Sequence, residues 1–240
     1  MGIRRPIAHL ARSYFGNAPE PVQTELQAVS ISGQALHKAF ATDLVTTTDN
    51  FGHITWMGQP IWQNILDLWT MQEVISRVRP SLLIECGTFK GGSSRFFGDL
   101  FNLQAQGHCI TIDVEAREFP KHERVTYLVG STLDEVNVAQ VAAAASAADG
   151  PVMVILDDDH SRDHVRKELD VYSPFVTVGS YLLVQDGVID TLDMFASGRP
   201  GPLPAIHDFV STHSDFVIES ELSTRFLITH HPSGWLRRRS

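Results

Sequence analysis

Apolar and polar positions along this chain follow two different periods. Between residues 61 and 78 the apolar side chains recur every three to four positions, which predicts an amphipathic helix ending before Pro80. Beyond it, short runs that are apolar throughout alternate with stretches of helical period. The runs predict strands at residues 82–84, 109–113, 125–129, 152–156 and 181–184. The intervening stretches predict helices through residues 96–100, 133–145 and 162–172.

Strands without a polar face are typical of a parallel sheet that helices cover on both sides. The pattern therefore predicts an α/β fold of the Rossmann-like, doubly wound kind with a mostly parallel sheet. A further helix is expected at residues 204–210. Two short apolar runs follow, at residues 216–218 and 225–229, and predict an antiparallel hairpin at the sheet edge.

The N-terminal quarter of the chain has a different pattern. Residues 1–25 show no sustained period and contain several prolines, while residues 26–60 mix short apolar pieces with polar ones. We therefore expect residues 1–60 to form an N-terminal arm and a cover over a pocket, and residues 61–240 to form one catalytic α/β domain. A chain of 240 residues is long enough to bury one large core.

Charge and composition exclude some partners. The net charge of −9 argues against a polyanionic partner, so neither nucleic acid nor an anionic membrane surface is expected. No window approaches the roughly 18 apolar residues of a membrane span. The two cysteines, Cys86 and Cys109, lie in predicted strands and suggest neither a disulfide framework nor zinc. With no apolar leader visible, a cytoplasmic protein is expected.

The turn after the first predicted strand is rich in glycine, which lets a backbone turn sharply and approach a ligand closely. It lacks the G-x-G-x-x-G spacing of dinucleotide sites. The acidic Glu85 at its start suits a cationic ligand, and S-adenosylmethionine carries both an ammonium and a sulfonium group. Asp113, ending the second strand, is placed to accept hydrogen bonds from ribose hydroxyls. The candidate cofactor-binding residues are Glu85, Gly87, Thr88, Gly91, Gly92, Ser93, Asp113, Ser131 and Asp157.

Acidic residues gather after the fourth and fifth strands, at residues 157–159 and at Asp186. Carboxylates at neighbouring strand ends repel one another unless a cation compensates them, and Mg²⁺ prefers such oxygen ligands. Asp157 or Asp159 is expected to serve the metal or the chemistry. His160, whose imidazole titrates near neutral pH, is the candidate general base that accepts a substrate hydroxyl proton.

Structural roles compete with these assignments. Asp157, Asp158 or Ser161 could cap the following helix, and His160 could be a hydrogen-bonded turn residue. His164, one turn further on, is expected on the helix surface. Residues 26–60 and 187–203 are expected to shape the substrate pocket. The candidates for its apolar wall, each of which could equally pack in the core, are Trp56, Met57 and Phe195.

Several ordered segments together resemble the cephalosporin hydroxylase and rhamnosyl O-methyltransferase family, from about residue 40 to residue 236. They are Ile54–Gly58, Asp67–Glu73, Ile84–Thr88 with Gly91–Ser93, Leu156–Ser161, Gly179–Asp186, Arg225–Leu227 and Gly234–Leu236. The resemblance implies a class I methyltransferase that uses S-adenosylmethionine and Mg²⁺ to methylate a hydroxyl of a sugar or natural product. It also implies self-association into a homo-oligomer.

The resemblance places His160 at the base position, and it places six residues at cofactor positions: Glu85, Gly87, Gly91, Gly92, Ser93 and Asp113. The metal positions it implies are Asp157 or Asp159, Gln185 and Asp186. Gln185 departs from the family pattern, which has Glu at this point, so one charge is lost and weaker metal binding or a metal-independent variant is expected. A catalytically weak cofactor-binding partner of another enzyme is one alternative. A nicotinamide-dependent oxidoreductase is another, which the missing glycine motif disfavours.

Overall fold

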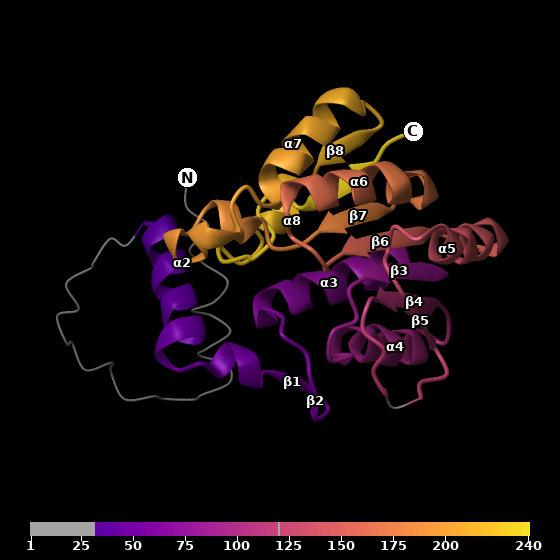
Figure 1. Ribbon diagram of the computed structural model, residues 1–240, viewed down its shortest axis with the longest axis horizontal. Helices are drawn as coiled ribbons and strands as arrows, with labels where there is room; N and C mark the ends of the chain where they lie inside the picture. The colour runs from indigo at the N-terminus through magenta and orange to yellow at the C-terminus, as the bar shows by residue number, and fades with distance from the viewer. Residues whose placement is uncertain (1–31, 120) are drawn as a thin grey trace, which may run out of the picture. The chain divides into compact units, whose positions relative to one another are not determined.

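The computed structural model describes residues 32–119 and 121–240, so the predicted arm over residues 1–25 lies outside the described residues. Residues 33–240 form one compact unit. Its centre is a seven-stranded sheet of order β5-β4-β3-β6-β7-β9-β8, with helices on both faces (Figure 1). This confirms the predicted α/β class and the mostly parallel, doubly wound sheet.

Five parallel strands carry the sheet. They are β3 (Leu82–Cys86), β4 (His108–Asp113), β5 (Val125–Val129), β6 (Val152–Leu156) and β7 (Tyr181–Val184). The chain runs outward from β3 to β4 and β5, then returns to the other side of β3 with β6. In such sheets the order reverses beside the first strand, and ligands bind at the carboxyl ends of the strands there.

Alternate residues of the strands feed two hydrophobic clusters, because successive side chains of a strand point to opposite faces. Leu82 and Ile84 enter the cluster covered by α5 (Glu135–Ala147), α6 (Arg162–Tyr172) and α7 (Pro202–Thr212). Leu83 enters the other cluster, which α3 (Ile65–Val78) and α4 (Gly92–Gln104) cover. Burial on both faces explains why these strands are apolar throughout.

Helix α3 begins and ends at recognisable local signals. The Asn64 side chain accepts a hydrogen bond from the backbone N–H of Leu66, so Asn64 is the N-cap, a favoured role for Asn. At the other end Arg79 adopts a left-handed conformation, before Pro80, which cannot continue a helix. The helix predicted from residue 61 therefore starts four residues later.

The predicted antiparallel edge is present, but one of its two strands is not the predicted one. The partner of β8 (Phe216–Ile218) is β9 (Trp235–Arg238), not residues 225–229, and β9 lies between β7 and β8. Trp235 is buried in the core, whereas Leu227 is 68% exposed and has a φ of 66°. The later apolar run therefore pairs with the sheet, and residues 224–234 form an irregular segment after the short helix α8 (Ser220–Ser223).

The described part of the N-terminal region contains elements that the sequence did not indicate. They are helix α2 (Gly33–Thr42), the π-helix η1 (Asp43–Thr47), the 3-10 helix η2 (Asn50–His53) and the two-stranded ribbon of β1 (Thr55–Trp56) and β2 (Gln59–Pro60). Three more 3-10 helices follow later in the chain, η3 (Ser173–Phe175), η4 (Gly187–Asp190) and η5 (Asp193–Gly198). Among the described residues, no helix has the length and apolar character needed to cross a membrane.

Candidate active site

The turn after β3 is shaped by close backbone packing. Gly87 has a φ of 98°, and a Cβ atom placed on it would lie 2.1 Å from the carbonyl oxygen of Asp157. Gly92 is equally restricted, since its Cβ would lie 2.2 Å from the carbonyl oxygen of Pro60. The glycines therefore bring this turn against the loop after β6 and against the N-terminal ribbon. Both contacts lie at the carboxyl edge of the sheet, where the sequence placed the cofactor.

Asp113 joins the ends of β3 and β4. Its Oδ2 accepts hydrogen bonds from the backbone N–H groups of Thr88 (3.1 Å) and Phe89 (2.7 Å), and its Oδ1 accepts one from Glu115 (2.9 Å). The hydroxyls of Thr88 and Thr111 lie 2.6 Å apart below this contact. Two carboxylate oxygens offer about four acceptor positions, so Asp113 can fix the turn and still accept a hydrogen bond from a ligand.

Glu85 is fully buried under the same turn. Neither of its carboxylate oxygens has a hydrogen-bond partner of normal geometry among the described residues. Burial raises its pKa to about 7, against the opposing effect of the nearby Ser93 and Thr111 side chains. A buried acid without a partner is costly and is typical of a functional position. Its charge would be stabilised by a cation nearby.

The remaining cofactor candidates border the same region. Ser93 lies in the first turn of α4 and is buried, while a Cβ on Gly91 would meet the ring of Phe119. Ser131 follows β5 and is fixed within its own loop, since its backbone N–H donates to Asp134 Oδ2 and its hydroxyl accepts from the backbone N–H of Leu133. These residues form an edge that continues from the β3 turn to the end of β5.

Three side chains converge where β6 and β7 end. One ligand atom each from Asp157, His160 and Asp186 lies within 4.8 Å of the others. His160 Nε2 is 3.1 Å from Asp186 Oδ2. Asp186 itself has a φ of 56°, a left-handed conformation that few non-glycine residues adopt. Two carboxylates and an imidazole around one point are a donor set suited to a divalent cation.

Asp157 is the most perturbed acid of this group. Its pKa is raised well above the usual range by burial, and by the negative charges of Asp186, Glu85 and Asp158. One neutral contact relieves it: the side-chain amide of Gln63 donates to Asp157 Oδ2 at 2.8 Å. Sequence reasoning missed Gln63, which precedes α3 and reaches the site only through the fold. The excess negative charge is what a bound cation would remove.

Two residues that the sequence predicted as metal ligands, Asp159 and Gln185, do not belong to this group of three. Asp159 is exposed, and its Oδ1 accepts a hydrogen bond from the backbone N–H of Ser161 at 2.8 Å, so it stands outside the group of three. Gln185 is buried with both of its amide atoms lacking a hydrogen-bond partner among the described residues. The catalytic and metal roles predicted for Asp159, and the metal role predicted for Gln185, stay predictions.

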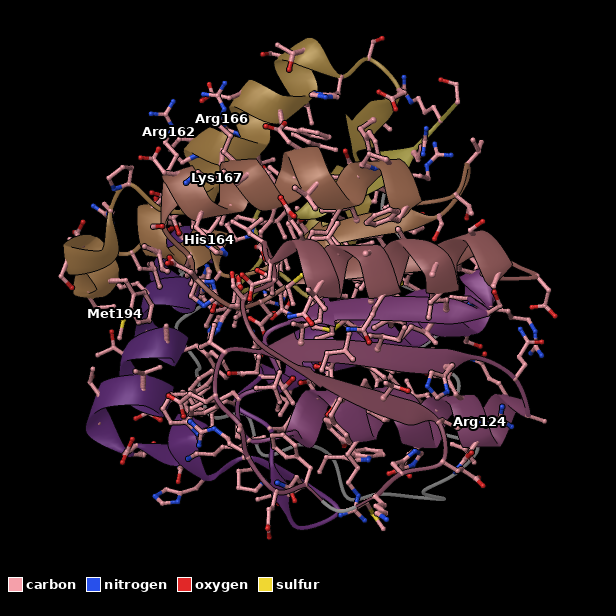
Figure 2. All side chains as sticks on the ribbon, turned by 45° about the vertical axis from the view of Figure 1, so that its right-hand side comes forward. Arg124, Arg162, His164, Arg166, Lys167 and Met194 are labelled. Carbon is pink, nitrogen blue, oxygen red and sulfur yellow. The ribbon has the colours of Figure 1, made fainter. Side chains whose placement is uncertain are left out.

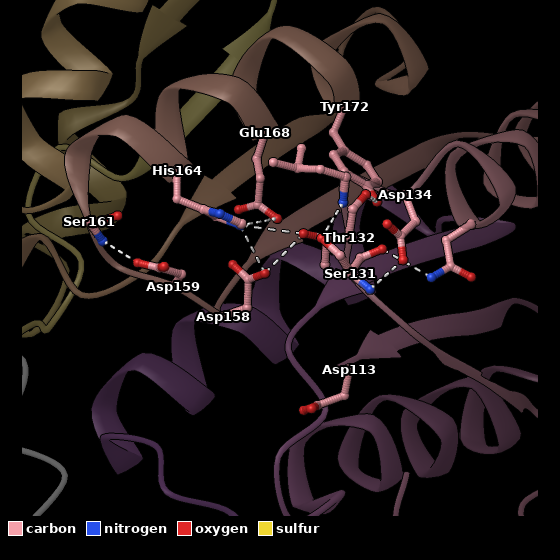
Figure 3. A network of polar contacts seen from close by, with 12 residues as sticks. Asp113, Ser131, Thr132, Asp134, Asp158, Asp159, Ser161, His164, Glu168 and Tyr172 are labelled. Carbon is pink, nitrogen blue, oxygen red and sulfur yellow. Dashed lines mark hydrogen bonds and ion pairs between the residues drawn. The ribbon is translucent and has the colours of Figure 1, made fainter. Parts of the chain in front are cut away.

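A second polar cluster corrects the expectation for His164. Its Nε2 lies 3.2 Å from Asp158 Oδ2, 3.5 Å from Glu168 Oε1 and 3.4 Å from the Thr132 hydroxyl (Figure 3). The side chain points inward from α6, on the side opposite Arg162 and Arg166 (Figure 2). Hydrogen bonds to Asp158 and Glu168 raise the pKa of His164 to about 10. His164 is therefore not a helix-surface residue.

This cluster links two loops that border the site. Thr132, after β5, donates its hydroxyl to Asp158 Oδ2 at 3.0 Å, and its carbonyl oxygen accepts a hydrogen bond from the Tyr172 hydroxyl at 2.6 Å (Figure 3). Burial raises the pKa of Glu168 to about 7. The cluster thus ties Asp158, the neighbour of Asp157, to the loop that carries Ser131. Asp158 is held by this network, not by a capping role.

A cavity of about 490 Å³ connects these features. Its lining includes the β3 turn, Asp113, Ser131, residues 157–160, His164 and Asp186. Its mouth is aromatic: the rings of Trp62 and Phe89 lie 5.0 Å apart, Phe51 lies 6.0 Å from Trp62, and the Lys90 ammonium sits over both Trp62 and Phe89. Trp62 and Phe89 both have positive φ values, 50° and 45°. Such strain in bulky residues concentrates at functional sites.

The apolar wall differs from the expected one. Trp56 packs against Phe96 and donates its indole N–H to Asp99, and Met57 is exposed. Phe195 packs on a small cluster that includes Val188. None of the three expected wall residues is among those that line the cavity. Phe51, from the expected cover region, and Trp62, just beyond it, line the cavity instead.

The seven-stranded sheet, whose parallel strand order reverses beside β3, has the α/β fold of class I methyltransferases. Solved structures of CmcI share this fold. One with magnesium and S-adenosylmethionine has a TM-score of 0.64 at 18% identity and covers 80% of this chain and 78% of that one. A CmcI apo structure gives a TM-score of 0.62 with the same coverage.

The particular family follows from the sequence match. The chain matches the family described as rhamnosyl O-methyltransferase/CmcI over residues 49–239, and it belongs to that family. It is 29% identical over 244 residues to rhamnosyl O-methyltransferases of Mycobacterium bovis strain BCG and Mycobacterium tuberculosis, covering 99% of this chain and 94% of those proteins. The Mycobacterium leprae rhamnosyl O-methyltransferase is 25% identical over 190 residues, covering 77% and 83% respectively. This chain is an O-methyltransferase.

Proposed function

We propose that this enzyme transfers the methyl group of S-adenosylmethionine to a hydroxyl of a sugar or natural-product acceptor, with assistance from Mg²⁺. The observation that carries the proposal is the convergence of Asp157, His160 and Asp186 in a cavity that begins at the glycine turn after β3. The mycobacterial relatives are named as rhamnosyl O-methyltransferases, which supports a hydroxylated, sugar-like acceptor.

The residues around the β3 turn fit S-adenosylmethionine. Glu85 is a buried acid with no hydrogen-bond partner among the described residues, in a position where a nearby ammonium or sulfonium would stabilise its charge. Asp113 keeps acceptor capacity for ribose hydroxyls, and Ser131 borders the part of the cavity where the adenine would lie. A solved CmcI structure contains this cofactor with magnesium, which supports the same pairing here.

The residues at the ends of β6 and β7 fit a divalent cation. Asp157 and Asp186 would hold it. Burial and the negative charge of Asp186 raise the pKa of Asp157, and a bound cation would offset this repulsion. When bound, Mg²⁺ would act as a Lewis acid that lowers the pKa of a substrate hydroxyl. Gln63 would keep its hydrogen bond to Asp157 and fix which carboxylate oxygen faces the cavity.

His160 would take the hydroxyl proton at its Nδ1, because its Nε2 faces Asp186 Oδ2 at 3.1 Å and carries the ring hydrogen in the neutral form. Its contact with Asp186 orients the imidazole and stabilises the imidazolium that forms. When bound, S-adenosylmethionine would supply the methyl group to the acceptor oxygen with cleavage of its carbon–sulfur bond, and a neutral thioether would be the leaving group. Because this displacement depends on alignment, the aromatic mouth contributes by excluding water and orienting the acceptor.

The test is Asp186→Ala in the full chain. We expect methyl transfer to fall below detection with Mg²⁺ and S-adenosylmethionine present, while calorimetric binding of S-adenosylhomocysteine and the circular dichroism spectrum stay at wild-type values. Panels of rhamnosides and hydroxylated natural products would serve as acceptors. Unchanged turnover in the variant would contradict the metal role.

A further inference from the structure

A buried network joins α3 to the irregular segment before β9. Asp67 on α3 accepts two hydrogen bonds, from the Thr229 hydroxyl at 2.6 Å and from the backbone N–H of His230 at 2.7 Å. The same Thr229 hydroxyl accepts a hydrogen bond from the backbone N–H of His231 at 2.9 Å. All four residues are buried. The network therefore fixes the backbone of residues 229–231 in a low-dielectric setting, where satisfied hydrogen bonds are strong.

This network ends at a proposed metal ligand. The backbone N–H of Asp186 donates to His231 Nδ1 at 3.1 Å. Nδ1 must then be unprotonated, so a neutral ring carries its hydrogen on Nε2, which faces Asp67 Oδ2 at 3.7 Å. The next turn is held in the same way, because Val188 donates its backbone N–H to the carbonyl oxygen of His230 at 3.0 Å.

The contact explains how Asp186 keeps its unusual backbone. A non-glycine residue in the left-handed region is strained, and such strain persists only when the surroundings enforce it. The hydrogen bonds from the Asp186 N–H to His231 and from the Val188 N–H to His230 fix the backbone directly after β7. The side chain of Asp186 is thereby directed toward Asp157 and His160.

We propose that His231, oriented by Asp67 and Thr229, is a positioning residue that sets the direction of the Asp186 carboxylate. The inference rests on the proposed cation role of Asp186, and it adds a residue that touches neither the cation nor the acceptor. Partners behind a ligand of this kind typically change metal affinity or activity by about 10- to 100-fold.

The design of the variants uses the geometry of the acceptor atom. The Oδ1 atom of Asn and the Nδ1 atom of His are both two bonds from Cβ. The substitution His231→Asn therefore keeps an acceptor for the Asp186 N–H. His231→Gln keeps a similar volume but moves the amide one carbon further away. His230→Gln is the matched control, because His230 is also buried and lies in the same segment, yet its ring makes no described hydrogen bond to Asp186.

The experiment measures Mn²⁺ affinity of the full-length variants by electron paramagnetic resonance, together with kcat, the KM for S-adenosylmethionine and the melting temperature. We expect H231Q to weaken Mn²⁺ binding by about 10- to 100-fold and to lower kcat without changing that KM. H231N and H230Q should stay near wild type. Equal losses in H231N and H231Q, an equal loss in H230Q, or no loss in H231Q would overturn the inference.

A second measurement does not depend on the metal. Hydrogen exchange at the Asp186 amide should be faster in H231Q than in H231N, because only the former loses the acceptor. If the wild-type chain binds no Mn²⁺, the proposed metal role is wrong, and this exchange comparison decides the positioning role by itself: equal rates would overturn it. Should H231Q fail to fold, Thr229→Val replaces it, since it removes only the hydroxyl that orients the His231 backbone and should raise the same exchange rate.

Discussion

His160 and Asp186 leave neighbouring strands β6 and β7 and meet with 3.1 Å between Nε2 and Oδ2. The contact places the one imidazole of the group of three beside the two carboxylates that would hold a cation. The base proposed at His160 would be oriented before any acceptor enters, so the chemistry and the binding of the cofactor should be separable by mutation.

His160→Ala should lower kcat by at least about 100-fold, since general base catalysis typically contributes 10² to 10⁴. Calorimetric affinity for S-adenosylhomocysteine should not change, because His160 contacts Asp186 and makes no described hydrogen bond to the β3 turn. His160→Gln is the matched control: it keeps a polar side chain near Asp186 but has no basic nitrogen, so it should be equally slow. Losses of similar size in turnover and in cofactor affinity would remove His160 as the base.

Gln185→Glu should strengthen Mg²⁺ binding and make stability depend on the metal. Without Mg²⁺ the variant should be destabilised by about 3 kcal/mol, because it buries an uncompensated carboxylate next to other acids. Mg²⁺ should restore the lost stability, which thermal melts with EDTA or with Mg²⁺ would measure. Gln185→Leu, which has no oxygen, is the control and should show no such recovery. The same Mg²⁺ dependence in the Glu variant and in the wild type would place residue 185 outside the metal site.

The cluster around His164 should make the stability of the protein fall as the pH rises. The pKa of His164 is raised from 6.5 to about 10, so its stabilising contribution is complete below about pH 6.5 and is lost through pH 10. The pKa of Glu168 is raised from 4.5 to about 7, so ionisation of its buried carboxyl costs stability between those values. His164→Gln should flatten the upper part of the curve and Glu168→Gln the lower part. Urea melts at closely spaced pH values would test this, and unchanged slopes would contradict it.

Gly87→Ala should damage the site more than the loss of glycine freedom explains. The added methyl would lie 2.1 Å from the Asp157 carbonyl oxygen, so the β3 turn or the β6 loop must move. Gly58→Ala is the control, because Gly58 has a similar positive φ of 84° and no atom within 4 Å of the new methyl. We expect about 1 kcal/mol of destabilisation for G58A and about 3 kcal/mol or more for G87A. Equal values in chemical denaturation would show that the close approach is not limiting.

The sheet was predictable because burial on both faces leaves a strong sequence signal. Strands β5, β6, β7 and β8 begin and end where the apolar runs do, and α6 matches its predicted range. The exception is β9, which the pattern did not predict because only two of its four residues are apolar. Residues 225–229 look like a strand, yet Trp235 fills the core better, and the sequence pattern does not weigh the volume of a buried side chain.

The site was predictable only as far as each residue follows its own strand. The positions of Asp157, His160 and Asp186 at strand ends are local information, and the parallel order then brings them together. Gln63 and His231 come from distant segments of the chain, so no local sequence pattern predicts that they reach the site. His164 was misplaced because its burial depends on Asp158 and Glu168 facing it, and a single helical turn does not reveal which face is covered.

The place of β9 inside the sheet has a consequence for how the molecule is built. The segment that carries His231 is anchored on one side by β8 and on the other by β9, and within the sheet β9 lies between β8 and the parallel strands. During synthesis, Asp186 leaves the ribosome long before its backbone partner. The five parallel strands are therefore complete along the chain before the carboxylate edge is, because the backbone contact at Asp186 needs a segment that lies beyond all of them.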